Sequence, residues 1–156
     1  MLDVINGLHE MQTFRLKGWR MKNLNDSVRR LVMSWPKLKA LKLSFSQFVS
    51  LSTLRIIAES CPELRHLRIR VDTSSIPPLD ISSKSLCHNL EVLTVGKAHP
   101  SITTQTLLES QIQVTRHLDL LFPYLKSIEV LPDDVTWSGI RDLVFLCQNA
   151  SLSRMK

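Results

Sequence analysis

The sequence predicts an α/β solenoid, a single domain built from repeated strand–helix units, and two observations support this prediction. A segment of the pattern x-L-x-x-L-x-L recurs along the chain. Most of the stretches between its copies have the apolar spacing of amphipathic helices. A strand followed by a helix, repeated at a nearly constant interval, is typical of solenoids, in which each unit packs only on its neighbours.

The repeated segment occurs in five copies: HEMQTFRL (9–16), PKLKALKL (36–43), PELRHLRI (62–69), HNLEVLTV (88–95) and PYLKSIEV (123–130). Their first apolar residues are separated by 27, 26, 26 and 35 residues (Met11, Leu38, Leu64, Leu90 and Leu125). The first three intervals lie in the roughly 20–29 residue range of leucine-rich repeats. We therefore predict a single leucine-rich-repeat domain of about five repeats over residues 1–156.

Each copy alternates apolar and polar residues, as expected of a strand with one buried face. In the second copy Leu41 and Leu43 are predicted to face the core, and Lys42 to face outward. The same alternation predicts four further inward pairs (Phe14 and Leu16, Leu67 and Ile69, Leu93 and Val95, Ile128 and Val130). Stacked in parallel, these strands form the concave face of the predicted solenoid, with helices or loops on its convex face.

Four segments are predicted to be helices: 26–34, 50–60, 104–121 and 137–150. Asp26 is expected to cap the first of them. Each has a stripe of apolar residues expected to be buried (Val28, Leu31, Val32, Trp35; Leu51, Leu54, Ala58, Cys61; Leu108, Ile112, Leu118, Leu121; Trp137, Ile140, Val144, Cys147). Residues 72–85 contain Pro77-Pro78 and many serines, so we predict an extended loop there, with a short turn near 82–86.

Composition argues against several classes of function. No apolar run is long enough to span a membrane, and the N-terminus lacks a secretory signal. The three cysteines are widely spaced, so we expect reduced core thiols in a cytoplasmic or nuclear protein (Cys61, Cys87, Cys147). The histidines are scattered, and Asp133-Asp134 directly precedes a predicted helix, whose N-terminus acidic residues complement. We therefore expect no catalytic residues, no metal and no cofactor.

Basic residues gather at the outward positions of the first three strands. Five of these nine positions are Lys or Arg and none is acidic, within a chain of net charge +6. With one histidine, they are the candidate partner-binding residues (Arg15, Lys17, Lys42, His66, Arg68 and Arg70). Because these cations suit carboxylates and phosphates, we predict an acidic or phosphorylated protein partner. Ordinary solvated strand surface is the alternative, and nucleic acid is a weaker one because no outward position is aromatic.

Several of these segments also resemble a known family. CPELRHLRI, preceded by LRIIAES, resembles the cysteine-containing leucine-rich repeats of F-box proteins. WPKLKALKL, SLCHNLEVLTVG, VTRHLDLLFPYLKSIE and WSGIRDLVFLCQ are similar to the C-terminal repeat region of fungal F-box-like proteins of the basidiomycete type, over roughly residues 8–150.

This resemblance implies a non-enzymatic receptor. An N-terminal F-box would dock a ubiquitin ligase through an adaptor, and the repeats would bind the substrate. Nothing before residue 8 matches an F-box. We therefore expect the chain to be a fragment of a longer F-box/leucine-rich-repeat protein, or one that has lost ligase docking. An interaction scaffold unrelated to ubiquitin is the alternative function.

Overall fold

The computed structural model describes residues 10–79, 86, 88–98 and 104–154. In this part of the chain five strands form one sheet and four helices accompany it. In chain order the elements are β1 (Thr13–Lys17), α2 (Leu24–Ser34), β2 (Ala40–Ser44), α3 (Leu51–Ser60), β3 (His66–Ile69), β4 (Val92–Val95), α4 (Thr104–Leu121), β5 (Ser127–Glu129) and α5 (Val135–Arg154). The predicted α/β class is confirmed.

The strands are all parallel and lie side by side in chain order, with each repeated segment in the same register. Leu41 pairs with Phe14 on one side and Leu67 on the other, and Leu67 pairs in turn with Leu93. The entry into each strand is also the same. A carbonyl of one copy accepts two successive N–H groups of the next, as Gln12 does from Lys39 and Ala40 at 2.7 and 3.0 Å. The same pair of bonds recurs at Lys39, Arg65 and Glu91.

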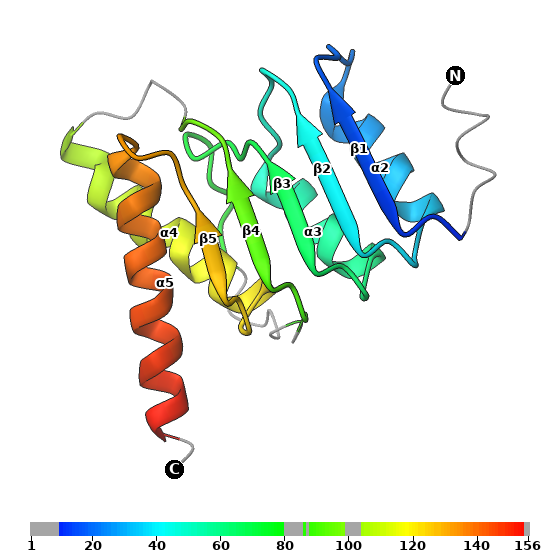
Figure 1. The fold of residues 1–156 in the computed structure, drawn as a ribbon. Coiled ribbons are helices and arrows are strands. Elements are labelled where there is room, and N and C mark those ends of the chain that lie inside the picture. The colour runs from blue at the N-terminus through cyan, green and yellow to red at the C-terminus, as the bar shows by residue number, and fades with distance from the viewer. Residues whose placement is uncertain (1–9, 80–85, 87, 99–103, 155–156) are drawn as a thin grey trace.

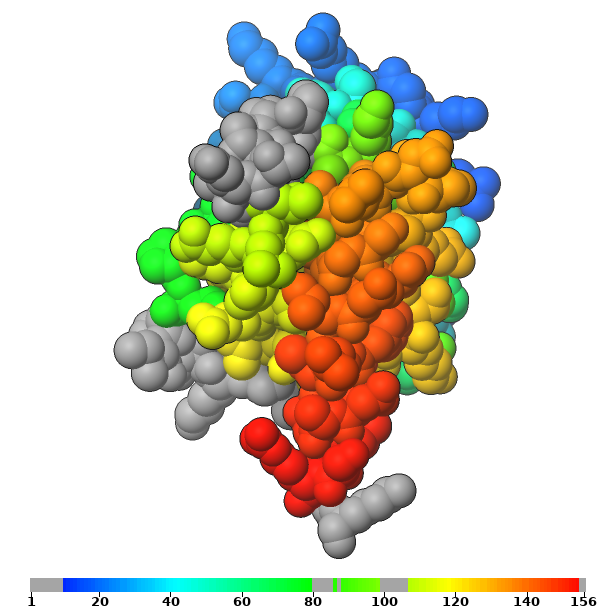
Figure 2. All heavy atoms as spheres, turned by 90° about the vertical axis from the view of Figure 1, so that its left-hand side faces the viewer, coloured from blue at the N-terminus to red at the C-terminus, as the bar shows by residue number. Residues whose placement is uncertain are grey.

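The helices α2, α3 and α4 lie on one face of the sheet, and the opposite face carries no described helix (Figure 1). We call this opposite side the strand face. The helix α5 lies beyond β5 and beside α4, and covers the end of the array (Figure 2). This arrangement leaves the outward strand residues accessible from the strand face.

The core lies between the sheet and the helices. The inward residues of β2, β3 and β4 are at most 3% exposed, and Phe14, Leu16 and Val130 are partly buried against them, as predicted. Trp35, Phe122 and Trp137 are fully buried, so these aromatic residues belong to the core. No described helix combines the length and apolar character needed to cross a bilayer.

The first two helices largely follow the predicted pattern. Their predicted stripes are buried, and Ser50 caps α3 by accepting a hydrogen bond from the Thr53 N–H at 3.1 Å. The prediction that Asp26 caps α2 is wrong, because the helix begins at Leu24 and Asp26 lies in its first turn. Asn23 takes the preceding position with a φ of 57°, a left-handed conformation that asparagine tolerates better than most residues.

The predicted stripes of α4 and α5 are partly wrong. Leu108 is 62% exposed, Ile112 is 38% exposed and Cys147 is exposed as well. The buried positions include Gln111 and Gln148 instead. Their amide groups donate to backbone carbonyls of the neighbouring helix, Gln111 to α5 and Gln148 to the end of α4, so hydrogen bonding determines how these helices face each other.

The prediction for residues 72–85 is confirmed over its described part, where residues 72–79 form no helix. The His117 ring lies 2.9 Å from the Pro77 carbonyl, which ties this loop to α4. The predicted turn near 82–86 and the predicted core thiol of Cys87 lie outside the described residues, apart from Leu86.

A carbonyl at the end of α2, of α3 and of α4 is contacted by a side chain from a later part of the chain. The Cys61 thiol donates to the Trp35 carbonyl at 3.5 Å, and the Gln148 amide donates to the Phe122 carbonyl at 3.1 Å. The His88 Nε2 lies 2.7 Å from the Cys61 carbonyl between these two. Three equivalent carbonyls therefore take their partners from three different residue types.

Candidate binding surface on the strand face

A row of polar side chains crosses the strand face in register. Arg15 of β1 pairs with Lys42 of β2, and Lys42 pairs with Arg68 of β3. The row continues through Thr94 of β4 to Glu129 of β5. Neighbouring strands lie roughly 4.8 Å apart, so the row places three cations, a hydroxyl and a carboxylate at regular steps across the sheet.

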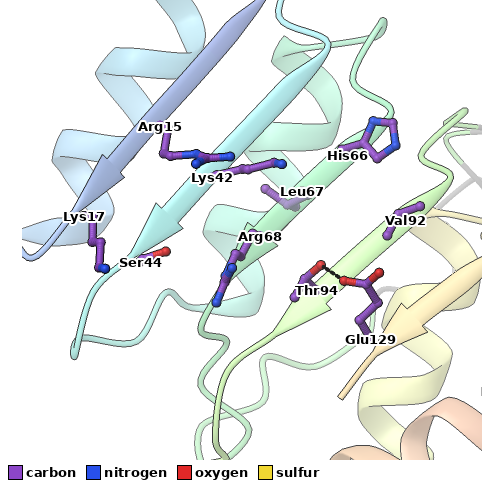
Figure 3. Close-up of a pocket in the computed structure, with 10 residues that line it drawn as sticks. All are labelled: Arg15, Lys17, Lys42, Ser44, His66, Leu67, Arg68, Val92, Thr94 and Glu129. Atoms are coloured by element: carbon purple, nitrogen blue, oxygen red, sulfur yellow. Dashed lines mark hydrogen bonds between the residues drawn. The ribbon is translucent and has the colours of Figure 1, made fainter. Parts of the chain in front are cut away.

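The row lines a hollow of about 480 Å³ on the strand face (Figure 3). Five of the six predicted binding residues line it (Arg15, Lys17, Lys42, His66 and Arg68). The alternation of the strands explains this, because residues two apart in a strand point to the same side. The sequence pattern therefore predicted residues that the fold does bring together.

The cations of the row have no acidic partner in the part of the chain that the structure describes. Within the described residues, Arg15, Lys42 and Arg68 form no ion pair, whereas Arg65, outside the row, has its guanidinium 3.2 Å from Glu91. Like charges directly opposite each other on a sheet are destabilising. An anion bound in the hollow would relieve this repulsion, so the row favours ligands with carboxylate or phosphate groups.

The sixth predicted residue, Arg70, is separated from the other five. Its guanidinium donates to the carbonyls of Ser46 at 3.0 Å and Lys97 at 3.3 Å, and lies 4.4 Å from the centre of the Phe48 ring. A Cβ at Gly96 would lie only 2.5 Å from the Arg70 Cγ, so the glycine makes room for this side chain. Arg70 thus joins the loops after β2 and β4 and does not line the hollow.

Five residues that line the hollow were not among the predicted site residues (Ser44, Leu67, Val92, Thr94 and Glu129), and two of them are joined by a hydrogen bond. The Thr94 hydroxyl donates to the Glu129 Oε2 at 2.7 Å, and this bond holds the carboxylate at the C-terminal end of the row (Figure 3). Glu129 is exposed. The alternation of the strands already places Thr94 and Glu129 at outward positions of the fourth and fifth copies, and only the choice of basic residues left them out of the candidate site.

Asp134, the second residue of the acidic pair before α5, has a structural role, as predicted for this pair. Asp134 Oδ1 accepts the Trp137 N–H at 3.0 Å, which caps the helix, and Oδ2 accepts the Ala98 N–H at 2.8 Å. Both oxygens of Asp134 are therefore engaged by the backbone.

The buried thiol of Cys61 and the buried imidazole of His88 are also held by contacts with the backbone. Burial raises the pKa of Cys61 to about 12, so its thiol stays protonated and donates to carbonyls. Burial lowers the pKa of His88, whose Nδ1 accepts the Leu90 N–H at 3.1 Å while Nε2 faces the Cys61 carbonyl. Among the described residues, no group of three or more His, Cys, Asp or Glu side chains is arranged to hold a metal ion.

A scan against protein-family models finds no match for this chain, and neither does a search of curated proteins.

Proposed function

We propose that the chain is a leucine-rich-repeat recognition module, the substrate-binding part of an F-box-like ubiquitin-ligase receptor of the fungal, basidiomycete type. The repeat architecture is supported by the parallel strands, their common entry bonds and the 26–27 residue spacing of the first four copies. The ligase connection is supported by the resemblance of the cysteine-containing copies to F-box protein repeats.

One observation carries the recognition role: the cations Arg15, Lys42 and Arg68, which form no ion pair with a described residue, line a hollow on the strand face. A protein partner with acidic or phosphorylated side chains matches this charge. Among the described residues, no Phe, Tyr or Trp lines the hollow to stack on bases, and Glu129 would repel a phosphate backbone. A protein is therefore favoured over nucleic acid. In this role the module needs no cofactor and acts in the cytoplasm or nucleus.

Reversing the charge of the row tests this role directly. The variant Arg15→Glu, Lys42→Glu, Arg68→Glu is compared in pull-downs from extract with Arg29→Glu, Arg30→Glu, Arg116→Glu, which changes the net charge equally at exposed helix positions. Circular dichroism checks that both variants are folded, and a nuclease-treated arm identifies partners held through RNA. We expect protein partners to be lost from the first variant alone. Equal retention by both variants would place recognition elsewhere.

The ligase connection has a separate test, because a scaffold unrelated to ubiquitin could use the same surface. Sequencing the 5′ region of the transcript reveals whether an F-box precedes these repeats. We expect the encoded full-length protein to co-purify with a ligase adaptor. If no F-box is encoded and no adaptor co-purifies, the chain is a scaffold, and the binding role of the row is unaffected.

A further inference from the structure

The charge of the row on the strand face changes sign from one end to the other. Its N-terminal end carries three cations, on β1, β2 and β3, and its C-terminal end carries the Glu129 carboxylate on β5. Thr94 between them is uncharged and donates its hydroxyl to Glu129. A uniformly acidic ligand would match one end of this row and be repelled at the other.

We propose that the hollow binds an extended peptide lying across the strands, with an acidic or phosphorylated side chain over Lys42 and Arg68 and a lysine or arginine of the same peptide against Glu129. This inference rests on the proposed recognition function and adds to it the orientation and the charge sequence of the ligand. Glu129 then determines specificity.

The surroundings of Glu129 leave it available for a ligand. It is exposed, and it forms no ion pair with a described residue. Glu91, by contrast, lies 3.2 Å from the guanidinium of Arg65 and 3.1 Å from the ammonium of Lys126. The single bond from Thr94 fixes the Glu129 Oε2 and leaves Oε1 to accept from a ligand cation.

The register sets the spacing of the two ligand charges. Lys42 and Glu129 are three strand intervals apart, which corresponds to roughly 14 Å at the usual strand separation. An extended peptide advances about 3.3 Å per residue, so its cation should lie about four residues from its anion. The change from positive to negative charge along the row also argues against nucleic acid, because each nucleotide adds another negative charge.

Binding of matched synthetic peptides tests the inference. The probes are fluorescein-labelled Gly-Ser peptides that carry a glutamate–phosphoserine pair, followed about four residues later by lysine, serine or glutamate. A second set replaces the phosphoserine with glutamate, to separate phosphorylated from acidic ligands. A single-stranded oligoribonucleotide is the third probe. Fluorescence polarisation measures the affinities of the unmodified chain, of Glu129→Lys, and of Glu109→Lys, which makes the same charge change at an exposed position of α4.

We expect the unmodified chain to bind the lysine peptide about two- to fivefold more tightly than the glutamate peptide, the range of an exposed ion pair. Glu129→Lys should reverse this order, whereas Glu109→Lys should preserve it. If anionic peptides bind but their order is the same in all three proteins, the inference is overturned and the proposed recognition function stands. If only the oligoribonucleotide binds, or if no peptide binds, the inference is wrong, and the pull-down with the charge-reversed row decides on the proposed function separately.

Discussion

The part of the molecule from β1 to β3 and the part from β4 to α5 share one strand register but differ in how their helices pack. The inner faces of α2 and α3 are made mainly of Leu, Val, Ile and Ala. Between α4 and α5, Gln111 lies against Gly139 and donates to the carbonyls of Val135 and Thr136 at 3.2 Å. Apolar spacing therefore identifies the buried face where a helix packs mainly on apolar neighbours, and identifies it poorly where backbone carbonyls must also be satisfied.

The two parts also differ on the strand face. The first carries the three cations of the row, and the second carries Thr94 and Glu129. Arg70 connects the parts, because its guanidinium reaches the carbonyl of Ser46 after β2 and that of Lys97 after β4. Four sets of substitutions test how far this contrast extends.

The largest effect is expected at Leu67, which is 1% exposed in the central strand. Leu67→Ala should lower the free energy of unfolding by about 2–5 kcal/mol, because it leaves a cavity in the core between the sheet and the helices. Leu108→Ala, at a position that the spacing predicted to be buried but that is 62% exposed, should change it by less than about 0.5 kcal/mol. Urea unfolding followed by circular dichroism measures both. Equal losses would contradict the orientation of α4.

A smaller difference in stability is expected between substitutions of Arg68 and Arg70, the two arginines at the end of the third copy. Arg70→Ser should destabilise the protein by about 1–2 kcal/mol, because it removes two bonds to carbonyls and the contact with Phe48. Arg68→Ser should leave stability within about 0.5 kcal/mol, or raise it slightly, because it relieves repulsion by Lys42. The same unfolding experiment applies. A loss for Arg68→Ser as large as for Arg70→Ser would mean that the row has a structural role.

The contact between α4 and α5 can be tested by whether Gly139→Ala stabilises or destabilises the protein. Alanine normally stabilises a helix by about 1 kcal/mol relative to glycine. A Cβ at Gly139, however, would lie 2.7 Å from the Gln111 Cδ and force its amide away from the two carbonyls. Gly139→Ala should therefore destabilise the chain by about 1 kcal/mol, yet stabilise a Gln111→Ala variant by about 0.5–1 kcal/mol. Stabilisation in both backgrounds would show that the amide bonds contribute nothing.

The smallest effect is a pH dependence at His88. Burial lowers its pKa in the folded protein below the ordinary value of 6.5, so the unfolded chain binds the proton more readily. The stability that this group contributes is present above pH 6.5 and is lost as the pH falls through the folded pKa. His88→Gln, which offers an amide like that of Gln148, should reduce the loss of stability between about pH 7.5 and about pH 5.5 by less than about 1 kcal/mol.

Unfolding titrations of the two proteins at both pH values provide the measurement. An identical decline in both would assign the acid sensitivity to other groups.

Much of the candidate site could be predicted because strand alternation is a local property. Once the copies were aligned, Arg15, Lys42 and Arg68 had to face the same side as their neighbours in register. Arg70 follows the same alternation but lies just after β3, where its long side chain reaches carbonyls of two other loops. No pattern within a single copy contains that information.

The sequence by itself determined the repeat period, the parallel strands, their register and the residues that line their two faces. All of these follow from apolar side chains spaced for one buried face. Only the tertiary structure decided which polar groups are buried. The carbonyls of Trp35, Cys61 and Phe122 occupy equivalent positions, yet the side chains that meet them are a thiol, an imidazole and an amide. A carbonyl specifies where its donor must lie and leaves the residue type open, so no spacing rule could identify these contacts before the chain was folded.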